Sequence, residues 1–438
     1  MARNPETKPL PFTDTRDEIG GVRGIANGDK NKLFAQDRAA HDWYRFVLSF
    51  PPQLVREYMN RLDVDTSATV LDPFCGTGTT LVECKKQGVK SVGFEAHPMA
   101  AFASRVKTNW AVDPDAISDF ASRVARAAER QVAKEGTELR RLPPGVQKLL
   151  LKGSISPRPL HKTRVLLETI RNQGETPCTD HALLAVANAL VNDIGNLHFG
   201  PEVGVRGDKE DAPVIACWKR NVGDMVTDLR KLQDKRETPA RAWCHDSRQG
   251  TGALDAGPVD AVITSPPYPN EKDYTRTTRL ETVLLGFVSS RKELRSLKQN
   301  LLRSNTRNVY KDDDDDRWID SFPRVQELAE RIEARRNRMG KTSGFERQYH
   351  RVVRLYFGGM ARHFAELRPL LRPGARLAYV VGDQASFLRV MIRTGQILAE
   401  IAESLGYQVE DIDLFRTRLA TATKEQLREE ILLLRWPG

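Results

Sequence analysis

Residues Ser265-Pro266-Pro267-Tyr268 follow the run Val-Ile-Thr and carry groups that could do chemistry. Neither proline can donate a hydrogen bond to a sheet, and each fixes φ near about −65°, so the chain must leave the strand as a stiff turn. Such a turn holds a hydroxyl, backbone carbonyl oxygens and an aromatic ring in fixed positions. The pattern predicts a pocket wall that accepts hydrogen bonds and stacks on a flat ligand.

Three acidic residues stand where short apolar runs end: Asp72 after "TVL", Glu95 after "SVGF" and Asp246 after "AWCH". In open α/β sheets, ligands bind at the carboxyl ends of the strands. Glu95 follows a glycine-rich turn at about the distance at which an acid accepts hydrogen bonds from the ribose hydroxyls. Asp246 could accept a hydrogen bond from the amine of an adenine. Together the three acids predict a ligand that contains a nucleoside.

The turn "DPFCGTG" lies between the strands that end at Asp72 and Glu95, and its Gly76 and Gly78 let the backbone approach a ligand closely. No Lys-Ser or Lys-Thr follows the glycines, and the third glycine of the dinucleotide-binding pattern is missing. Asp72 would also place a negative charge where a pyrophosphate would lie. A ligand with a cationic centre fits better, and S-adenosylmethionine, with its sulfonium and amino groups, has that charge pattern.

The elements that must position these residues are those of an open α/β sheet with helical insertions. The spacing of apolar residues and the positions of glycine and proline predict helices at 52–62, 114–136, 181–197 and 390–405. A strand–turn–helix–strand unit is expected over 68–98, and further strands over 240–247, 259–268 and, after a turn at Pro373-Gly374, 375–383. The last two strands, at 409–418 and 429–436, are close enough to form an antiparallel hairpin.

Composition favours a protein that meets nucleic acid in the cytoplasm. Lys and Arg exceed Asp and Glu by 68 to 58, a net charge of +10, which is typical of proteins with a phosphate-rich partner, although a basic solvated surface is the alternative. The five cysteines show no Cys-x-x-Cys pair and no metal-binding spacing, which favours a reducing compartment. We expect neither a secretion signal nor a membrane span, because no apolar stretch is long enough for either.

The pair "LDPFCGTGTT" and "TSPPY" resembles the S-adenosylmethionine-dependent DNA amino-methyltransferases, which modify exocyclic amines of DNA bases. The chain looks most like the N4-cytosine type, because that type commonly has Ser where N6-adenine enzymes usually have Asp or Asn. The resemblance implies a Rossmann-like methyltransferase with a mostly parallel sheet, an antiparallel C-terminal hairpin and helical insertions. It also implies double-stranded DNA as partner, with the target cytosine flipped out of the helix.

By the same resemblance, "FVLSFPPQLV" is the motif that cradles the methionine part of the cofactor, and "RLETVLLGF" is the helix that follows the catalytic motif. The cofactor contacts that it implies are Phe50, Pro51, Asp72, Pro73, Phe74, Gly76, Gly78, Thr79, Glu95, Asp246 and Ser265. The catalytic turn would be Ser265, Pro266, Pro267 and Tyr268. The expected divisions are an N-terminal arm (1–40), the cofactor-binding half (41–110), a helical insertion (111–239), the catalytic part (240–287), a basic helical insertion (288–345) and the rest of the core (346–438).

These residue types suit transfer of a methyl group to an amine. The lone pair of cytosine N4 is delocalised into the ring, so a site must accept hydrogen bonds from the amine and aim its lone pair at the methyl group. The Ser265 hydroxyl and the Pro266 carbonyl could be those acceptors, and Tyr268 could stack on a base rotated out of its helix. His97 and His245 lie close to the acids in the sequence, but no set of catalytic partner residues is evident for them, so no role is assigned to them.

Other interpretations stay open at this stage. N6-adenine methylation is the nearest, because Ser265 biases the choice of base without excluding adenine. An RNA base methyltransferase and a nucleic-acid-binding protein on a catalytically dead scaffold are the others. The sequence does not settle the recognition sequence, the oligomeric state, or whether a cognate restriction enzyme accompanies the protein.

Affinity for DNA is expected to come from the insertions. Residues 291–311 hold seven Lys or Arg against one Glu, and residues 335–355 add a second basic stretch with Phe345 and Tyr349 among the cations. The run of five Asp at 312–316 is expected to be a solvated loop. Both 111–239 and 288–345 are eligible to recognise the target sequence.

Overall fold

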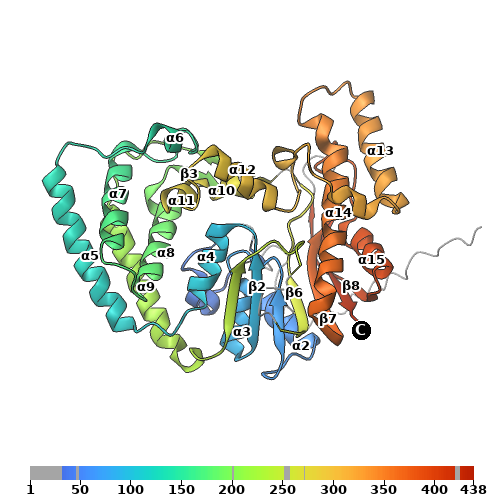
Figure 1. Ribbon diagram of the computed structural model, residues 1–438, viewed down its shortest axis with the longest axis horizontal. Helices are drawn as coiled ribbons and strands as arrows, with labels where there is room; N and C mark the ends of the chain where they lie inside the picture. Colours follow the sequence, from blue (N-terminus) through green and yellow to red (C-terminus); the bar gives the residue numbers. More distant parts are fainter. Residues whose placement is uncertain (1–31, 46–48, 200–201, 251–256, 271, 420–424) are drawn as a thin grey trace, which may run out of the picture.

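The computed structural model describes residues 32–45, 49–199, 202–250, 257–270, 272–419 and 425–438. Within these ranges, seven strands form one sheet in the order β5-β2-β1-β6-β7-β9-β8. The strands are β1 (Thr69–Asp72), β2 (Lys90–Glu95), β5 (Ala240–Cys244), β6 (Val259–Thr264), β7 (Leu371–Gly382), β8 (Gln408–Leu419) and β9 (Gln426–Arg435). The strands from β5 to β7 are parallel, and β9 is antiparallel to both β7 and β8. This topology confirms the predicted fold class (Figure 1).

The order of the strands reverses between β1 and β6. From β1 the chain adds β2 and then β5 on one side, and β6 and β7 on the other. The gap between the crossovers at such a reversal is where ligands bind in open α/β sheets. Because β1 ends in "DPFCGTG" and β6 ends in "TSPPY", the topology brings the two motifs together at this edge.

Helices cover both faces of the sheet. They are α1 (Arg38–His41), α2 (Pro52–Arg61), α3 (Thr79–Gln87), α4 (Pro98–Lys107), α5 (Pro114–Glu135), α6 (Pro144–Gln147), α7 (Pro157–Arg171), α8 (Thr179–Ala189), α9 (Val214–Leu232), α10 (Tyr274–Thr277), α11 (Arg279–Leu284), α12 (Arg291–Asn300), α13 (Pro323–Arg338), α14 (Tyr349–Leu367) and α15 (Thr394–Ser404). Local chemistry fixes several ends: Asp113 caps α5 by accepting a hydrogen bond from the Asp115 amide, and Gly88 ends α3 in the left-handed conformation.

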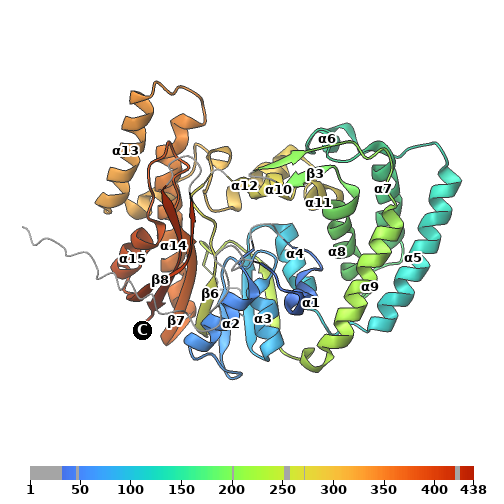
Figure 2. The same ribbon diagram turned by 180° about the vertical axis from the view of Figure 1, so that it is seen from behind.

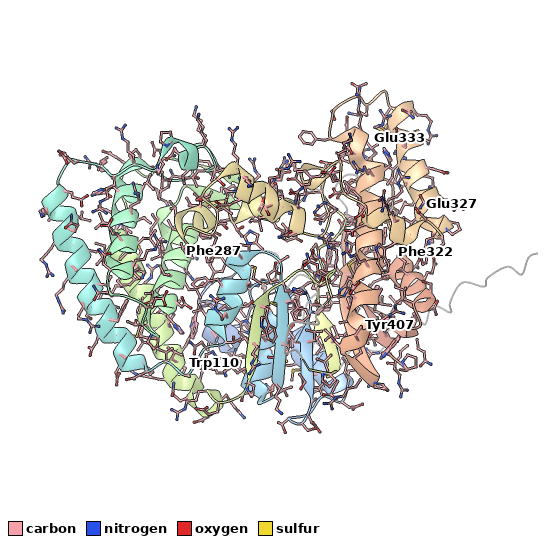
Figure 3. All side chains as sticks on the ribbon, in the orientation of Figure 1. Trp110, Phe287, Phe322, Glu327, Glu333 and Tyr407 are labelled. Atoms are coloured by element: carbon pink, nitrogen blue, oxygen red, sulfur yellow. The ribbon has the colours of Figure 1, made fainter. Side chains whose placement is uncertain are left out.

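Alternate residues of the central strands belong to different cores. In β9, Ile431 and Leu433 pack with α2 on one face of the sheet, whereas Leu432 and Leu434 pack with α14 and α15 on the other. This explains why "EEILLLRW" reads as a continuous apolar run: a strand that is covered on both faces has no polar side. Tyr407, which precedes β8, belongs to the α14–α15 side (Figure 3).

Residues 111–239 form a helical lobe beside the sheet, built from α5 to α9 and the two-stranded hairpin of β3 (Leu197–Phe199) and β4 (Val203–Val205). Its core is continuous with α4 and α11 and includes Trp218 and, from the connection before α5, Trp110. Figures 1 and 2 show the lobe on one side of the sheet, α13 to α15 on the other, and α10 to α12 between them above the strand ends.

The segment 288–345 differs from the sequence-based expectation. The five Asp at 312–316 were expected to form a solvated loop, but Asp313 and Asp315 have side chains only 8% and 7% exposed and are paired with Arg303 and Arg248. Part of this run forms the short helix η5 (Asp315–Ile319), which packs against α14. The prediction that this run is solvated was therefore wrong for Asp313 and Asp315. The sequence alone cannot show that buried arginines lie opposite these acids.

Two further local predictions need correction or restriction. Pro373-Gly374 was expected as a turn before a strand, whereas β7 already pairs with β6 at Leu371 and the two residues lie in a bulge, with Gly374 at φ +86°. Of the expected arm 1–40, residues 1–31 lie outside the described residues. Its described end joins the fold, since the Ala40 amide donates to Asp228 at 3.2 Å. None of the helices that the structure describes has the length and apolar character needed to cross a bilayer.

Candidate active site

A cleft of about 320 Å³ lies at the carboxyl ends of the parallel strands, where the strand order reverses. Its lining comes from residues before α2, the β1–α3 turn, the ends of β2, β5 and β6, the 300–308 segment, and β7 to β9. Of the residues predicted as site residues, those in the lining are Phe50, Pro51, Pro73, Phe74, Gly76, Thr79, Glu95, Asp246, Ser265, Pro266, Pro267 and Tyr268. The first three residues of "FVLSFPPQLV", 46–48, lie outside the described residues.

Asp72 and Gly78 lie beneath the lining rather than in it. Asp72 is fully buried and accepts hydrogen bonds from the Thr264 hydroxyl at 2.6 Å and the Phe74 amide at 3.1 Å. Burial raises the pKa of Asp72 to about 6. Asp72 therefore joins the end of β1 to the end of β6, and any direct contact with a ligand remains a prediction for it.

The two glycines of the β1–α3 turn are needed for different structural reasons. A Cβ on Gly78 (φ +86°) would lie 2.9 Å from the Ser104 hydroxyl, so this glycine lets α3 and α4 pack closely. Gly76 (φ +52°) would place a Cβ in open space, with no described atom within 4 Å. Because Gly76 lines the cleft, a side chain there would occupy part of it.

Glu95 ends β2 and holds the turn in place. Its Oε2 accepts a hydrogen bond from the Gly76 amide at 2.9 Å, and its Oε1 accepts one from the His97 amide at 2.7 Å. Burial raises the pKa of Glu95 to about 7, and the nearby charges of Asp72 and Asp246 act in the same direction. A carboxylate has about four lone-pair sites, so two backbone bonds leave capacity for a ligand hydroxyl.

Asp246 follows β5 and is held by Arg248. The Arg248 guanidinium donates to both carboxylate oxygens, at 3.0 Å and 2.8 Å, and the Arg248 amide donates to Oδ1 at 3.0 Å. The same guanidinium donates to Asp315 at 2.5 Å and to the Asn300 carbonyl at 3.1 Å. Asp246 therefore has a fixed orientation at the cleft wall, and its three bonds leave about one lone-pair site, on Oδ2, for a ligand.

The catalytic turn of the prediction starts directly after β6. The Ser265 hydroxyl donates a hydrogen bond to the Val380 carbonyl at 3.2 Å and also lies in hydrogen-bonding contact with the Tyr268 side chain, which leaves part of its acceptor capacity for a ligand. The Tyr268 ring lies against Gly382 at the end of β7, where a Cβ would come within 2.9 Å of its Cε2 atom. The glycine in "VVGD" thus lets an aromatic ring lie close over the strand end.

Comparison with known proteins shows similarity to DNA methyltransferases. The N6/N4 family described as DNA methylase matches residues 26–103, the stretch that holds the β1–α3 turn and Glu95. In this stretch the chain is similar to the DNA amino-methyltransferases. It is 22% identical over 435 residues to the Type II methyltransferase M.BsoBI of Geobacillus stearothermophilus, covering 89% of this chain and 83% of that relative.

Two further relatives are also Type II methyltransferases. The Type II methyltransferase M.AvaI of Nostoc sp. (strain PCC 7120) is 24% identical over 467 residues, covering 95% of this chain and 89% of that protein. M.MjaII of Methanocaldococcus jannaschii, also a Type II methyltransferase, is 36% identical over 67 residues, which are 15% of this chain and 12% of that protein.

Solved structures were matched with low similarity scores. TrmN from Thermus thermophilus aligns with a TM-score of 0.28 at 11% identity, over 91% of this chain and 52% of that one. The rRNA methyltransferase aviRa from Streptomyces viridochromogenes aligns with a TM-score of 0.33 at 10% identity, over 95% and 94%. At these scores an alignment does not identify a shared fold, so the topology of the sheet itself carries the fold assignment.

Sequence reasoning missed several residues that line the cleft. Four lining residues have a buried polar atom without a hydrogen-bond partner among the described residues, and these atoms are Thr77 Oγ1, His97 Nδ1, Ser247 Oγ and Asn308 Oδ1. Thr77 and Ser247 adjoin predicted contacts in the sequence and could have been found by that adjacency. Asn308 has no such neighbour, because it comes from an insertion.

His97 received no role from the sequence, and the structure gives it a clear position. It is 4% exposed, lines the cleft, and its Nε2 lies 3.0 Å from the Thr278 hydroxyl. Burial lowers the pKa of His97 to about 4, so the imidazole is neutral near pH 7. A neutral imidazole in this wall adds a polar group without adding a positive charge.

The cleft suits the ligand that the sequence predicts, S-adenosylmethionine. Two carboxylates, Glu95 and Asp246, face a lining that also contains the unpartnered hydroxyls of Thr77 and Ser247. Open space above Gly76 leaves room for ligand atoms. Acids and hydroxyls together match a ligand that has positive charge, ribose hydroxyls and an amine.

Proposed function

We propose that the protein transfers a methyl group from S-adenosylmethionine to the exocyclic N4 of cytosine in a specific double-stranded DNA sequence. The observation that carries this proposal is the Ser265 hydroxyl. Its hydrogen is directed to the Val380 carbonyl, so its oxygen is left as an acceptor in the cleft. Ser265 is the first residue of the turn whose motif resembles that of the N4-cytosine enzymes.

In this proposal the cofactor is held by the β1–α3 turn and the strand-end acids. Gly76 and Thr79 would lie against it, Glu95 would accept hydrogen bonds from the ribose hydroxyls, and Asp246 would accept one from the adenine amine. Phe50, Pro51, Pro73 and Phe74 would supply apolar walls. Bound there, S-adenosylmethionine would supply an electrophilic methyl group.

The side chains of the turn would prepare the amine. Ser265 Oγ and the Pro266 carbonyl accept the two amine hydrogens, which localises the nitrogen lone pair and stabilises the positive charge that grows on nitrogen. The two prolines keep these acceptors in place, so little reorganisation is needed when the base arrives. Tyr268 stacks on the base, which must leave its helix because a paired base hides its amine from a pocket.

DNA would lie across the elements above the strand ends. Arg291, Lys292 and Arg295 of α12 are exposed and are our candidates for phosphate contacts. Two other cations of the basic stretch 291–311 have internal partners: Lys298 binds Asp273 at 3.1 Å, and Arg303 binds Asp313 at 2.6 Å. We assign phosphate contact to 288–345 and leave 111–239 as the alternative for target recognition. The Type II relatives favour a partner restriction enzyme for this chain.

The decisive experiment is incubation of unmethylated genomic DNA with labelled S-adenosylmethionine, followed by nucleoside digestion and mass spectrometry. We expect labelled N4-methylcytosine, and about 100-fold slower labelling by Ser265→Ala, because one preorganised polar group contributes about that much. Ser67→Ala is the matched control, since Ser67 is exposed before β1, at the opposite edge of the sheet.

Each outcome decides between the alternatives. Labelled N6-methyladenine would keep the family and overturn the choice of cytosine. Label only in RNA would overturn DNA as the substrate. Cofactor binding with no label in any nucleic acid would favour a catalytically dead scaffold.

A further inference from the structure

The segment 301–308 is a polar loop that the fold buries. Its sequence, LLRSNTRN, reads as part of a charged surface, yet Ser304, Asn305 and Asn308 are at most 1% exposed. Burying this many polar groups costs free energy unless each finds a partner. Such a loop therefore needs a structural or functional reason.

Arg303 provides the structural frame. It is 3% exposed, and its guanidinium donates to the carbonyls of Lys298 at 2.9 Å and Gln299 at 3.0 Å. The same side chain makes a two-pronged bond with Asp313, at 2.9 Å and 2.6 Å. The loop is thus tied to the end of α12 and to the run of acids before η5, in one fixed conformation.

A chain of hydrogen bonds joins this loop to the turn that carries Tyr268. The Asn270 amide donates to the Tyr268 carbonyl at 2.8 Å, and the Lys272 amide donates to Asn270 Oδ1 at 3.0 Å. Asn305 Nδ2 in turn donates to the Lys272 carbonyl at 3.0 Å. The loop therefore holds its position relative to the catalytic turn.

Asn305 also sets the position of Asn308. Its Oδ1 accepts a hydrogen bond from the Arg307 amide at 3.0 Å and so caps the short helix η4 (Thr306–Asn308). Asn308 stands at the end of that helix, lines the cleft, and has Oδ1 buried with no partner among the described residues. A buried carboxamide that is carried on a fixed turn and has an unpaired oxygen in a cleft wall is suited to a polar ligand edge.

We propose that Asn308 contacts the hydrogen-bonding edge of the flipped target base and so contributes to the choice of base. This inference rests on the proposed function of the cleft. Because Ser265 and Pro266 take both amine hydrogens, the carboxamide would meet the ring nitrogen of cytosine: rotation by 180° exchanges its donor and acceptor ends and lets Nδ2 donate to that nitrogen. Recognition by a buried polar group discriminates strongly, since a wrong base leaves that group unpaired.

The test compares Asn308→Ala and Asn308→Asp with the wild type on unmethylated genomic DNA and labelled S-adenosylmethionine. Aspartate has the shape of asparagine but lacks its donor, so it keeps the packing and changes only the chemistry. We expect both variants to label DNA at least about tenfold more slowly. We also expect a larger share of the label in adenine than the wild type gives. Cofactor affinity by calorimetry should stay at the wild-type value in both variants, and the melting temperature should stay at the wild-type value in Asn308→Ala.

Thr306→Ser is the matched control, because Thr306 lies in the same helical turn outside the cleft lining, and its rate should not change. Wild-type rates and base composition in both Asn308 variants would overturn the inference. Loss of cofactor binding along with activity in both would also overturn it, because it would show a purely structural role. If the wild type labels no DNA base at all, the proposed function fails instead.

Discussion

Glu95 shows how one side chain can hold the site together and remain available to a ligand. Its two backbone hydrogen bonds orient the carboxylate, and its burial makes the charged form costly enough to raise its pKa to about 7. The charge is therefore easily lost just below neutral pH. A cationic ligand with hydroxyl donors would favour the ionised form.

This predicts a pH-dependent affinity for S-adenosylmethionine. Because the proposed contact needs the carboxylate, affinity should be highest above pH 7 and fall by up to about tenfold per pH unit below it. Glu95→Gln should bind more weakly at pH 8 and lose most of this dependence. Because the pKa of Asp72 is about 6, its protonation should leave a smaller pH dependence of the affinity at lower pH. Calorimetry from pH 5.5 to 8.5 measures both, and a wild-type affinity that is flat between pH 6 and 8 would contradict the contact.

At the scale of elements, the insertion 288–345 is part of the cleft through Arg248. This residue binds Asp246 at the end of β5 and Asp315 at the start of η5, and all three side chains are at most 10% exposed. Two glycines of α14 make room for the contact, since a Cβ on Gly358 would lie 2.0 Å from the Asp315 carbonyl oxygen. Two glycines in the middle of a helix reduce its stability. The close approach of Asp315 explains why Gly358 and Gly359 occur in α14.

We predict that Arg248→Met lowers the free energy of unfolding by about 3 to 5 kcal/mol. The substitution keeps a long side chain and leaves the buried carboxylates of Asp246 and Asp315 without their shared partner. Urea denaturation measures the change. Arg317→Met is the control: its ion pair with Asp314 is 3.6 Å long and the Arg317 side chain is 78% exposed, so it should change stability by less than about 0.5 kcal/mol. If the two substitutions lowered the free energy of unfolding equally, the buried network would contribute no more to stability than the exposed ion pair.

At the scale of the whole molecule, the question is which side of the cleft meets DNA. The net charge of +10 does not answer it, because many cations are paired internally. The helical lobe lies on one side of the sheet and α13 on the other, with α12 between them above the strand ends (Figure 1). Exposed cations occur on both, for example Arg126 and Arg130 of α5 and Arg291 and Lys292 of α12.

Salt dependence distinguishes the two sides. Each phosphate contact that is lost should reduce the slope of log K against log salt concentration by about 1, so the double variant of Arg291 and Lys292 to Ala should reduce it by about 2. The double variant of Arg126 and Arg130 to Ala should leave the slope unchanged. Fluorescence anisotropy with duplex DNA over a salt series measures this, and the opposite result would assign DNA contact to the helical lobe.

Much of the fold could be predicted from the sequence, because its signals are local. Proline at the first turn of α2, the Asp113 cap of α5 and the glycine after α3 define helix ends over a few residues. The candidate site was also predictable, since both of its motifs are contiguous and each follows a strand. What failed were positions whose environment comes from elsewhere in the chain, such as Asp313 and Asp315.

The sequence by itself determined the resemblance to a family, the strands and the chemical groups of the cleft, because these depend on short motifs and on periodicity. Only the tertiary structure decided that Asp72 lies under the cleft, that Arg248 holds Asp246, and that the 301–308 loop forms a wall beside Tyr268. Each of these depends on side chains that are far apart in sequence and are brought together by the reversal of strand order and by the insertions. Burial and pairing are properties of that assembly, and no single segment encodes them.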